Sequence, residues 1–130
     1  MKIAFLCGSC EPGADGVGDY TLSVARALVG RGHICFVIAL NDRYVDQPHH
    51  SWIESNPECS LPCLRLPYAS PWRVRAKILA AELERFRPDW ISLQYVPYAF
   101  NKNGLPWPLF PSLRAVRPLA KWHLMAHELW

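Results

Sequence analysis

A short apolar run, a glycine-rich loop and an amphipathic helical pattern follow one another at the start of the chain. This succession limits the fold more than any other feature. Residues 3–7 are typical of a strand buried on both faces of a sheet. Four glycines and one proline interrupt residues 8–19, and apolar residues at 20, 24, 25, 28 and 29 then recur with the spacing of one helical face. The order of these segments predicts the opening of a βα unit.

The same alternation continues along the chain. Apolar runs predict strands at 2–7, 33–40, 61–66, 90–96 and 121–126, and a helical stripe lies between the third and fourth runs. The first two strands and their helix occupy about 38 residues, which suits a parallel crossover. We expect a single α/β domain over 1–130, a three-layer Rossmann-like half-domain whose parallel sheet has the strand order 3-2-1-4-5. Pro62 places the third strand near a sheet edge.

Three connecting regions carry more specific expectations. Residues 41–60, with adjacent histidines at 49 and 50, are predicted to form a surface loop. Ser70 is predicted to cap a helix that continues to about Arg87, with a buried stripe of Val74, Ile78, Leu79, Leu83 and Phe86. Residues 97–111 are rich in proline and aromatic side chains. A functional loop and a plug for the core are equally good interpretations of that composition.

Composition and charge exclude several classes of protein. A formal charge of +3 is too small and too dispersed to indicate nucleic-acid binding. No run approaches the roughly 20 apolar residues of a membrane span, and the first run is too short for a signal peptide. The expected compartment is the cytoplasm. Trp72, Arg73, Arg75 and Lys77 are predicted to form a solvated basic face, with peripheral contact to the inner face of the membrane as the alternative.

The five cysteines are interpreted mainly as reduced structural thiols, because Cys7 and Cys35 fall within apparent core strands. Two alternatives remain open. A zinc site would need the pairs Cys7–Cys10 and Cys59–Cys63 to converge. Thiol redox chemistry at Cys7 and Cys10 would follow a strand, as such motifs do, but eight residues separate Cys10 from the helix. No cofactor is expected.

Polar residues that could meet a ligand gather where the predicted strands end. Ligands of open parallel sheets bind outside the carboxyl ends of the strands, where the strand order reverses. The candidates there are the loop 8–19, Asn41, Asp42, the pair Gln94–Tyr95 and the pair His127–Glu128. A glycine loop before a helix also predicts an anion site. The dinucleotide fingerprint and the phosphate-binding loop of nucleotide hydrolases are both missing from this sequence.

Short motifs in a consistent order add a family resemblance. Gly16-Val17-Gly18-Asp19-Tyr20-Thr21 at the first helix and Gly32-His33 before the second strand are two of them. Arg87-Pro88-Asp89, Gln94-Tyr95 and His127-Glu128 follow around the fourth and fifth strands. Together they resemble the N-terminal domain of a GT-B-fold glycosyltransferase of family 4. The resemblance spans nearly the whole chain, and the order of the motifs carries it.

The resemblance implies a reaction and a set of site residues. The family moves a sugar, with retention, from a nucleotide diphosphate-sugar to an acceptor hydroxyl, without a metal. By resemblance, Gly16, Val17 and Gly18 approach the phosphates and His127 acts on the transferred sugar. The wider substrate site would include Asp19, Gln94, Tyr95 and Glu128. A sugar or a lipid-linked acceptor is the implied second partner, and this half of the enzyme would provide the acceptor side.

Three further expectations complete the interpretation. The nucleotide-binding second domain of the family lies outside these 130 residues, so the chain alone is expected to be inactive as a transferase. Its last strand, ending in Leu129-Trp130, is expected to promote self-association through 121–130. A non-catalytic flavodoxin-like binding domain is the main alternative, and a thiol oxidoreductase built on Cys7 and Cys10 is the other.

Overall fold

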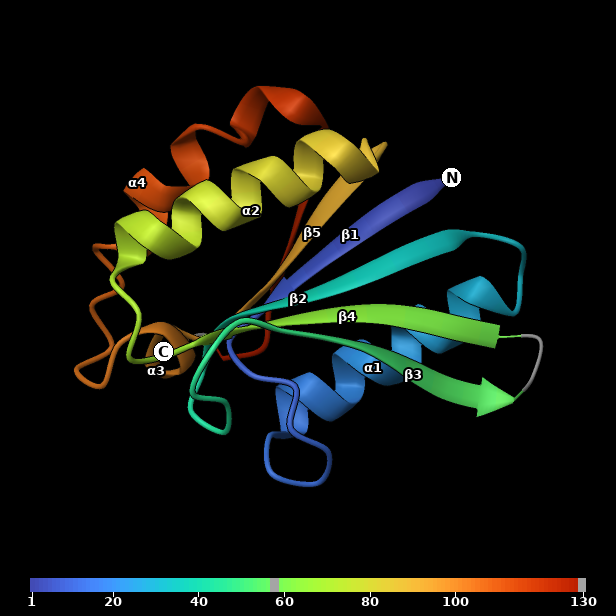
Figure 1. Ribbon diagram of the computed structural model, residues 1–130, viewed down its shortest axis with the longest axis horizontal. Coiled ribbons are helices and arrows are strands. Elements are labelled where there is room, and N and C mark those ends of the chain that lie inside the picture. The colour runs from blue at the N-terminus through green and yellow to red at the C-terminus, as the bar shows by residue number, and fades with distance from the viewer. Residues whose placement is uncertain (57–58, 129–130) are drawn as a thin grey trace.

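The computed structural model of the chain describes residues 1–56 and 59–128, with side chains described for all of these except 54–56 and 59. One six-stranded sheet runs through it in the order β3-β4-β2-β1-β5-β6 (Figure 1). The strands are β1 (Lys2–Cys7), β2 (Ile34–Asp42), β3 (His49–Asn56), β4 (Cys59–Pro67), β5 (Trp90–Tyr95) and β6 (Lys121–Ala126). The helices are α1 (Gly16–Val29), α2 (Trp72–Phe86), α3 (Pro97–Phe100) and α4 (Leu109–Arg114), with a 3-10 turn η1 (Arg117–Leu119).

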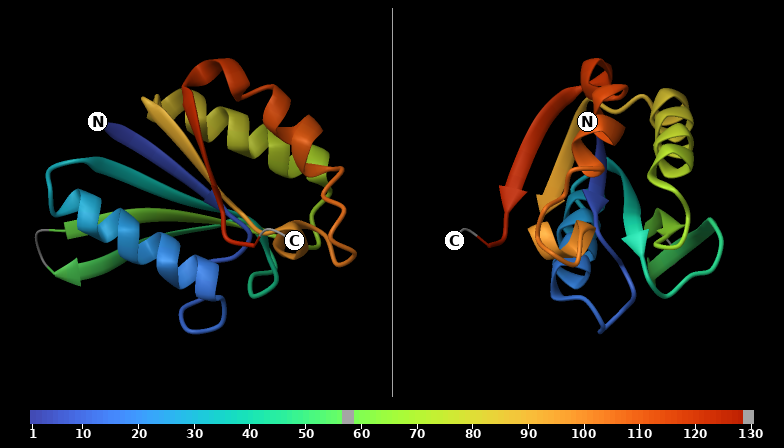
Figure 2. Two further views of the ribbon diagram at one scale, coloured as in Figure 1. Left: turned by 180° about the vertical axis from the view of Figure 1, so that it is seen from behind. Right: turned by 90° about the vertical axis from the view of Figure 1, so that its left-hand side faces the viewer.

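The sheet is mixed, which corrects the prediction of a wholly parallel sheet in the order 3-2-1-4-5. The five predicted runs do pair in parallel with the expected neighbours, so β1 lies between β2 and β5, and β6 lies outside β5 (Figure 2). The strand β3 is added beyond β4 and runs antiparallel to it. Residues 49–56 are therefore an edge strand within a segment that was predicted to be a loop.

Strand β3 lacks the apolar pattern of a buried strand. Backbone pairing with β4 holds it in the sheet, so it does not need that pattern. Its residue Trp52 is 67% exposed, and among the β3 residues whose side chains are described only Ile53 packs against the core. Pro62 was predicted to place its strand near a sheet edge, and β4 lies next to the edge strand β3, although the order 3-2-1-4-5 had put it at the edge itself. The paired register between β4 and β2 begins at Cys63. The missing N–H of Pro62 therefore interrupts no pairing with β2.

Alternating side chains of the sheet divide the core into two layers. In β1, Ala4 and Leu6 pack on the side of α2 and α4, whereas Ile3, Phe5 and Cys7 pack on the side of α1. The sheet thus has α1 over one face and α2 with α4 over the other (Figures 1 and 2). This is the expected three-layer α/β arrangement, produced by burial on both faces of the parallel strands.

Helix α2 differs from its prediction at two positions. Val74, expected in the buried stripe, is 39% exposed, and Arg75, expected on a solvated face, is only 3% exposed. Arg75 lies in register with the buried Leu79 and Leu83, four residues apart along one face. Its cationic group is buried because it donates hydrogen bonds to the end of β2. The predicted basic face therefore loses Arg75, while Arg73 and Lys77 remain exposed.

The two ends of α2 also depart from the predicted signals. The capping position is Pro71, with no side-chain hydrogen bond, so Ser70 does not cap the helix. At the other end, Arg87 adopts a left-handed conformation with φ 52° and ends the helix as predicted near that residue.

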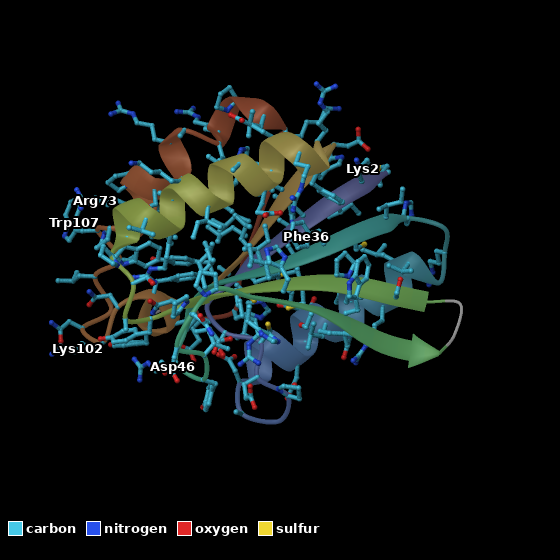
Figure 3. All side chains as sticks on the ribbon, in the orientation of Figure 1. Lys2, Phe36, Asp46, Arg73, Lys102 and Trp107 are labelled. Atoms are coloured by element: carbon cyan, nitrogen blue, oxygen red, sulfur yellow. The ribbon has the colours of Figure 1, made fainter. Side chains whose placement is uncertain are left out.

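Residues 97–111 plug the core in part, and a functional role for this loop stays a prediction. Phe100 and Leu109 are buried in the core layer beneath α2, whereas Tyr98 and Trp107 are 55% and 76% exposed. Figure 3 shows Trp107 and Arg73 on the outside of the molecule, and Phe36 between the sheet and α2. Over the described residues, none of the helices has the length and apolar character needed to cross a membrane.

Candidate ligand site at the carboxyl edge of the sheet

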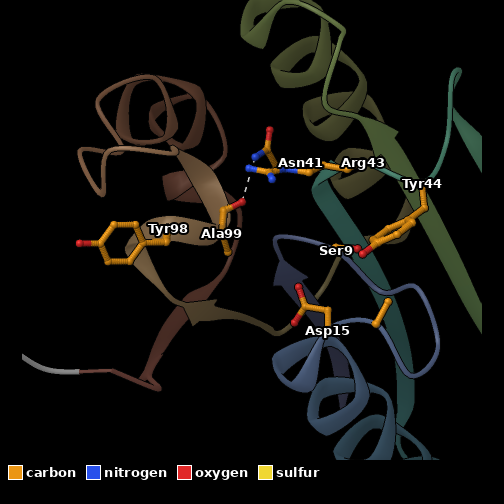
Figure 4. Close-up of a pocket in the computed structure, with 8 residues that line it drawn as sticks. Ser9, Asp15, Asn41, Arg43, Tyr44, Tyr98 and Ala99 are labelled. Atoms are coloured by element: carbon orange, nitrogen blue, oxygen red, sulfur yellow. Dashed lines mark hydrogen bonds between the residues drawn. The ribbon is translucent and has the colours of Figure 1, made fainter.

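The strand order reverses at β1, which makes the crevice outside β1 and its neighbours the first place to look for a ligand. The chain passes from β1 through α1 to β2, which lies on one side of β1. It later passes from β4 through α2 to β5, which lies on the other side of β1. A hollow of about 220 Å³ lies at this edge (Figure 4). It is lined by Ser9, Ala14 and Asp15 after β1, by Asn41, Arg43 and Tyr44 at the end of β2, and by Tyr98 and Ala99 in α3.

Two glycines allow the segments around the hollow to approach closely. A Cβ on Gly8 would lie 2.6 Å from the Cβ of Ala99, and a Cβ on Gly18 would lie 2.5 Å from the backbone oxygen of Ser9. Both positions therefore require glycine. A Cβ on Gly16 would meet nothing within 4 Å, so close packing does not require glycine there.

Asn41 ties three segments together. Its backbone N–H donates to the oxygen of Gly8 at 2.8 Å, and its carboxamide Nδ2 donates to the oxygen of Ala99 at 2.9 Å. Its Oδ1 accepts a hydrogen bond from Nη1 of Arg75 at 2.6 Å. The backbone and side chain of one buried residue therefore fix the loops after β1, β2 and β5 relative to one another. Asn41 was predicted to lie at this edge of the sheet, but its role in joining three segments was not predicted.

Arg75 provides a buried positive group behind Asn41. Its Nη1 also donates to the oxygen of Leu40 at 2.7 Å, and its guanidinium lies 3.9 Å from the ring centre of Trp72. Burial lowers the pKa of Arg75 to about 10. This value is still far enough above 7 for Arg75 to be charged at neutral pH. In the described part of the chain it has no carboxylate partner, and its Nε has no hydrogen-bond partner.

Asp15 occupies the amide groups that were predicted to bind phosphate. Its Oδ1 accepts hydrogen bonds from the backbone N–H groups of Val17 and Gly18 at 2.9 and 3.0 Å. This is a regular N-cap, and the sequence signal for it, an aspartate just before a helix, was readable. Asp19 similarly accepts from the N–H of Gly13 at 3.1 Å. An anion at this helix end would have to compete with a carboxylate already in place.

Asp42 and Arg65 form an ion pair beneath the same loop. Arg65 donates from Nε and Nη2 to the two carboxylate oxygens of Asp42 at 2.8 and 3.1 Å, and Nη2 also donates to Glu11. Asp42 accepts further hydrogen bonds from the N–H groups of Tyr44 and Cys10. Burial alone would raise the pKa of Asp42, but these hydrogen bonds outweigh it and hold the pKa below its usual value. The arrangement makes Asp42 a structural anchor of the loop.

A second set of polar side chains lies on the face of β5 that is turned toward α1. His127 Nε2 and Gln94 Oε1 are 2.9 Å apart, Gln94 Nε2 donates to Ser92 Oγ at 2.8 Å, and Ser92 Oγ lies 2.9 Å from His123 Nδ1. Because Gln94 Oε1 can only accept, His127 donates from Nε2. The rings of His127 and of Tyr20 in α1 also meet edge to face, with ring centres 5.0 Å apart.

Apart from His127, these side chains border an open, mainly apolar groove of about 300 Å³ between α1 and the strands β1, β5 and β6. Ser92, Gln94 and His123 give the groove its polar strip, and Tyr20 and Met125 contribute to its walls. The side chain of Tyr95 is on the opposite face of the sheet, where its ring stacks on Phe100 at 6.2 Å. Glu128 is exposed beside His127.

The predicted site residues thus fall into separate places. Gly16, Val17, Gly18 and Asp19 form the first turn of α1, and His127 meets Gln94 across β5 and β6. None of the residues that the resemblance selected lines the 220 Å³ hollow. Arg43 and Tyr44, which do line it, were not predicted, and their only sequence signal is their position just beyond the end of β2. Tyr98 also lines it and was covered only by the interpretation of 97–111 as a functional loop.

The cysteine arrangement does not favour redox chemistry between Cys7 and Cys10. Burial, followed by the nearby Cys10, Asp15 and Asp42, raises the pKa of Cys7. Cys10 lies instead against Cys63, with 3.1 Å between the sulfur atoms. Among the described residues there is no cluster of three or more histidine, cysteine or acidic side chains suited to a metal ion. The side chain of Cys59 lies outside the described part of the structure.

Comparisons with known proteins add no relative. No protein-family model matches the chain, and neither the curated proteins nor the solved structures include a significant match.

Proposed function

We propose that this chain is the N-terminal half-domain of a GT-B-fold glycosyltransferase of family 4 type, and that it binds the acceptor. The enzyme would move a sugar from a nucleotide diphosphate-sugar to an acceptor hydroxyl. The observation that carries the proposal is the polar hollow at the reversal of strand order, lined from the ends of β1, β2 and β5. The motif order in the sequence supplies the reaction class.

The chemistry of the hollow suits a small ligand with several hydroxyl groups. One oxygen of Asp15 caps α1, which leaves its other carboxylate oxygen as an acceptor at the hollow. Tyr44 contributes a hydroxyl group and Arg43 a guanidinium, while the ring of Tyr98 points away from Asp15 (Figure 4). A volume of about 220 Å³ is smaller than the roughly 300–1,000 Å³ of pockets for drug-sized ligands. One sugar ring is the proposed occupant.

The capped helix end favours the acceptor over the diphosphate as the ligand of this loop. A phosphate approaching Val17 and Gly18 would meet the negative charge of Asp15 and would have to displace it. A neutral sugar can instead donate a hydroxyl hydrogen bond to that carboxylate without disturbing the cap. The loop is therefore proposed to contact the acceptor sugar first.

His127 is proposed to contact the transferred sugar. Its Nε2–H is engaged by Gln94, which leaves Nδ1 as the acceptor for a sugar hydroxyl. Tyr20 and Gln94 together fix the ring orientation. In this proposal Gln94 is a positioning residue. Glu128, which follows His127 in the chain, is an exposed hydrogen-bond acceptor.

An isosteric substitution at Asp15 tests the proposal. We would follow backbone amide signals by NMR while adding monosaccharides or nucleotide diphosphate-sugars to the wild type and to Asp15→Asn. Asparagine caps helices as well as aspartate does, so the loop should keep its structure. Sugar-induced shifts around Ser9, Asp15 and Asn41 that weaken in Asp15→Asn would support the acceptor role. Asp46→Asn removes an exposed carboxylate outside the hollow and serves as the matched control.

The same titration can contradict the proposal. Stronger binding of the nucleotide diphosphate-sugar to Asp15→Asn, with no response to any sugar alone, would make the loop a phosphate site instead of an acceptor site. The absence of any response to both ligand classes at millimolar concentration would reject the carbohydrate assignment.

A further inference from the structure

Two cysteines far apart in the sequence lie against each other below the loop after β1. The sulfur atoms of Cys10 and Cys63 are 3.1 Å apart, although 53 positions separate the residues. A disulfide bond has a length of about 2.05 Å, so a closure of about 1 Å would join them. Cys10 and Cys63 are 2% and 1% exposed, and both belong to the core layer on the side of α1.

Hydrogen bonds and strand pairing hold the backbone around the two thiols. The N–H of Cys10 donates to Asp42 at 3.3 Å, and the neighbouring Glu11 accepts from Arg65 of β4. Cys63 pairs with Val37 of β2 on one side and with Ser51 of β3 on the other. A side-chain movement can therefore close the sulfur pair while the ion pair and the sheet stay in place.

We propose that Cys10 and Cys63 are the site of a reversible disulfide that a hydroperoxide closes and a thiol reductant opens. Cys10 is the sulfur that meets the oxidant, because it lies on a loop whose next residues, Glu11 to Ala14, are half-buried or exposed. Cys63 is the resolving sulfur within the sheet. This inference is independent of the proposed transfer of a sugar.

The reaction balances with hydrogen peroxide as the oxidant. The thiolate of Cys10 attacks one peroxide oxygen, the O–O bond breaks, and hydroxide leaves and takes up a proton to form water. The sulfur of Cys63 then attacks the sulfenic sulfur of Cys10, the S–O bond breaks, and a second water leaves. Two thiols thus lose two electrons and two protons, while the peroxide is reduced to two waters.

The environment of the pair sets the conditions for this reaction. The contact with Cys63, together with burial, raises the pKa of Cys10. Thiolate is the reacting form, so closure should be slow at neutral pH and faster as the pH rises. This behaviour would suit a site that responds to sustained oxidation and would not suit a rapid oxidoreductase.

Peptide mapping of the oxidised wild-type chain is the direct test. The folded protein is treated with hydrogen peroxide at mildly alkaline pH, the remaining thiols are alkylated, and the peptides are identified by mass. The expected result is a peptide linking Cys10 to Cys63, a fall from five reactive thiols to three on unfolding, and full reversal by a reductant. A bond between Cys7 and Cys10, or an unlinked Cys10 oxidised beyond the sulfenic acid, would overturn the proposal.

Two variants sharpen the test. Cys63→Ala should leave Cys10 as a trappable sulfenic acid, whereas Cys35→Ala, which changes another buried cysteine, should still close. In the wild type, oxidation should raise the thermal midpoint by on the order of 10 °C, because the bond closes a long loop. An oxidised protein with an unchanged or lower midpoint would contradict the claim that the fold already holds the two sulfurs in place.

Discussion

The two sides of β1 are held together by different means. Toward β2 and β4, the structure buries a thiol pair, the anchor Asn41 and the carboxylate of an ion pair, and every residue of β2 after the first is buried. Toward β5 and β6, the face next to α1 is open, and β6 has no fully buried residue. Strong polar contacts in the first region are shielded from water, whereas those in the second border a groove. The first region should therefore determine stability and the second should tolerate change.

The largest effect is expected from removing the carboxylate of the buried ion pair. Asp42→Ala leaves Arg65 without its main partner and leaves the N–H groups of Tyr44 and Cys10 unpaired. We expect a loss of about 3–5 kcal/mol in the free energy of unfolding, measured by urea denaturation. The control is Arg85→Ala, which breaks the exposed pair with Glu82 and should cost less than about 1 kcal/mol. Equal effects would mean that burial does not distinguish the two pairs.

The same ion pair predicts a response to acid. The pKa of Asp42 is lower in the folded chain than in the unfolded one. Its contribution to stability is therefore fully present above the unfolded value of about 3.9 and is lost as the pH falls through the folded pKa. The unfolding free energy of the wild type should decrease across this window. Asp42→Asn should be less stable at neutral pH and should show a shallower decrease, and a parallel decrease in both proteins would exclude Asp42 as the source.

Two glycines of α1 should respond in opposite directions. Gly18→Ala places a Cβ 2.5 Å from the backbone oxygen of Ser9, so the loop after β1 must shift. A cost of about 1–3 kcal/mol is expected. Gly16→Ala meets nothing within 4 Å and should be neutral or stabilising by up to about 1 kcal/mol. Thermal unfolding of both variants decides the point, and a destabilised Gly16→Ala would show that this glycine has a role outside packing.

Removing the N-cap of α1 should lower the free energy of unfolding, whereas removing Ser70, the expected cap of α2, should not. Asp15→Ala removes the acceptor for Val17 and Gly18 and should cost about 1 kcal/mol. Ser70→Ala removes a side chain that caps nothing and should change the unfolding free energy by less than about 0.5 kcal/mol. A similar loss in both variants, measured by urea denaturation, would contradict the assignment of Pro71 as the capping position of α2.

The smallest change in stability is expected along the open face of β5. Gln94→Leu removes the link between His127 and Ser92, at a cost of about 1 kcal/mol or less. The NMR signal of the imidazole N–H proton provides the sharper measurement. In the wild type the Nε2–H of His127 should be hydrogen-bonded, with its proton signal shifted downfield and protected from exchange, and both effects should be lost in the variant. An unchanged Nε2–H signal would mean that Gln94 does not hold His127.

Most of the fold followed from apolar runs, and the exceptions have physical reasons. The runs at 2–7 and 33–40 are close to β1 and β2, because buried parallel strands show continuous hydrophobic sequence. The run at 121–126 matches β6, although β6 has no fully buried residue. The strand β3 was missed because an edge strand can be polar when backbone pairing holds it. Arg75 was misplaced because a cation within a helical stripe looks solvated until its acceptors at the end of β2 are known.

The candidate site was less predictable than the fold. Sequence reasoning placed the candidate residues at the carboxyl edge of the sheet, where the hollow lies, and named Asn41 and Asp42 among them. It could not show that Asp15 occupies the amides of the glycine loop, since that depends on the rotamer of one side chain. The approach of Cys10 to Cys63 is also a property of the sheet register, which no local spacing encodes.

The antiparallel strand β3 has a consequence for the time course of folding. It returns the chain from the end of β2 to the start of β4 and pairs with β4, its close neighbour in sequence. A two-stranded unit of this kind forms in roughly 1–10 μs, whereas parallel pairing must first close a longer loop. We therefore expect the β3–β4 pair to form early and to present β4 to β2 as part of a preassembled hairpin. The parallel pairs that involve β1, β5 and β6 would then set the overall folding rate.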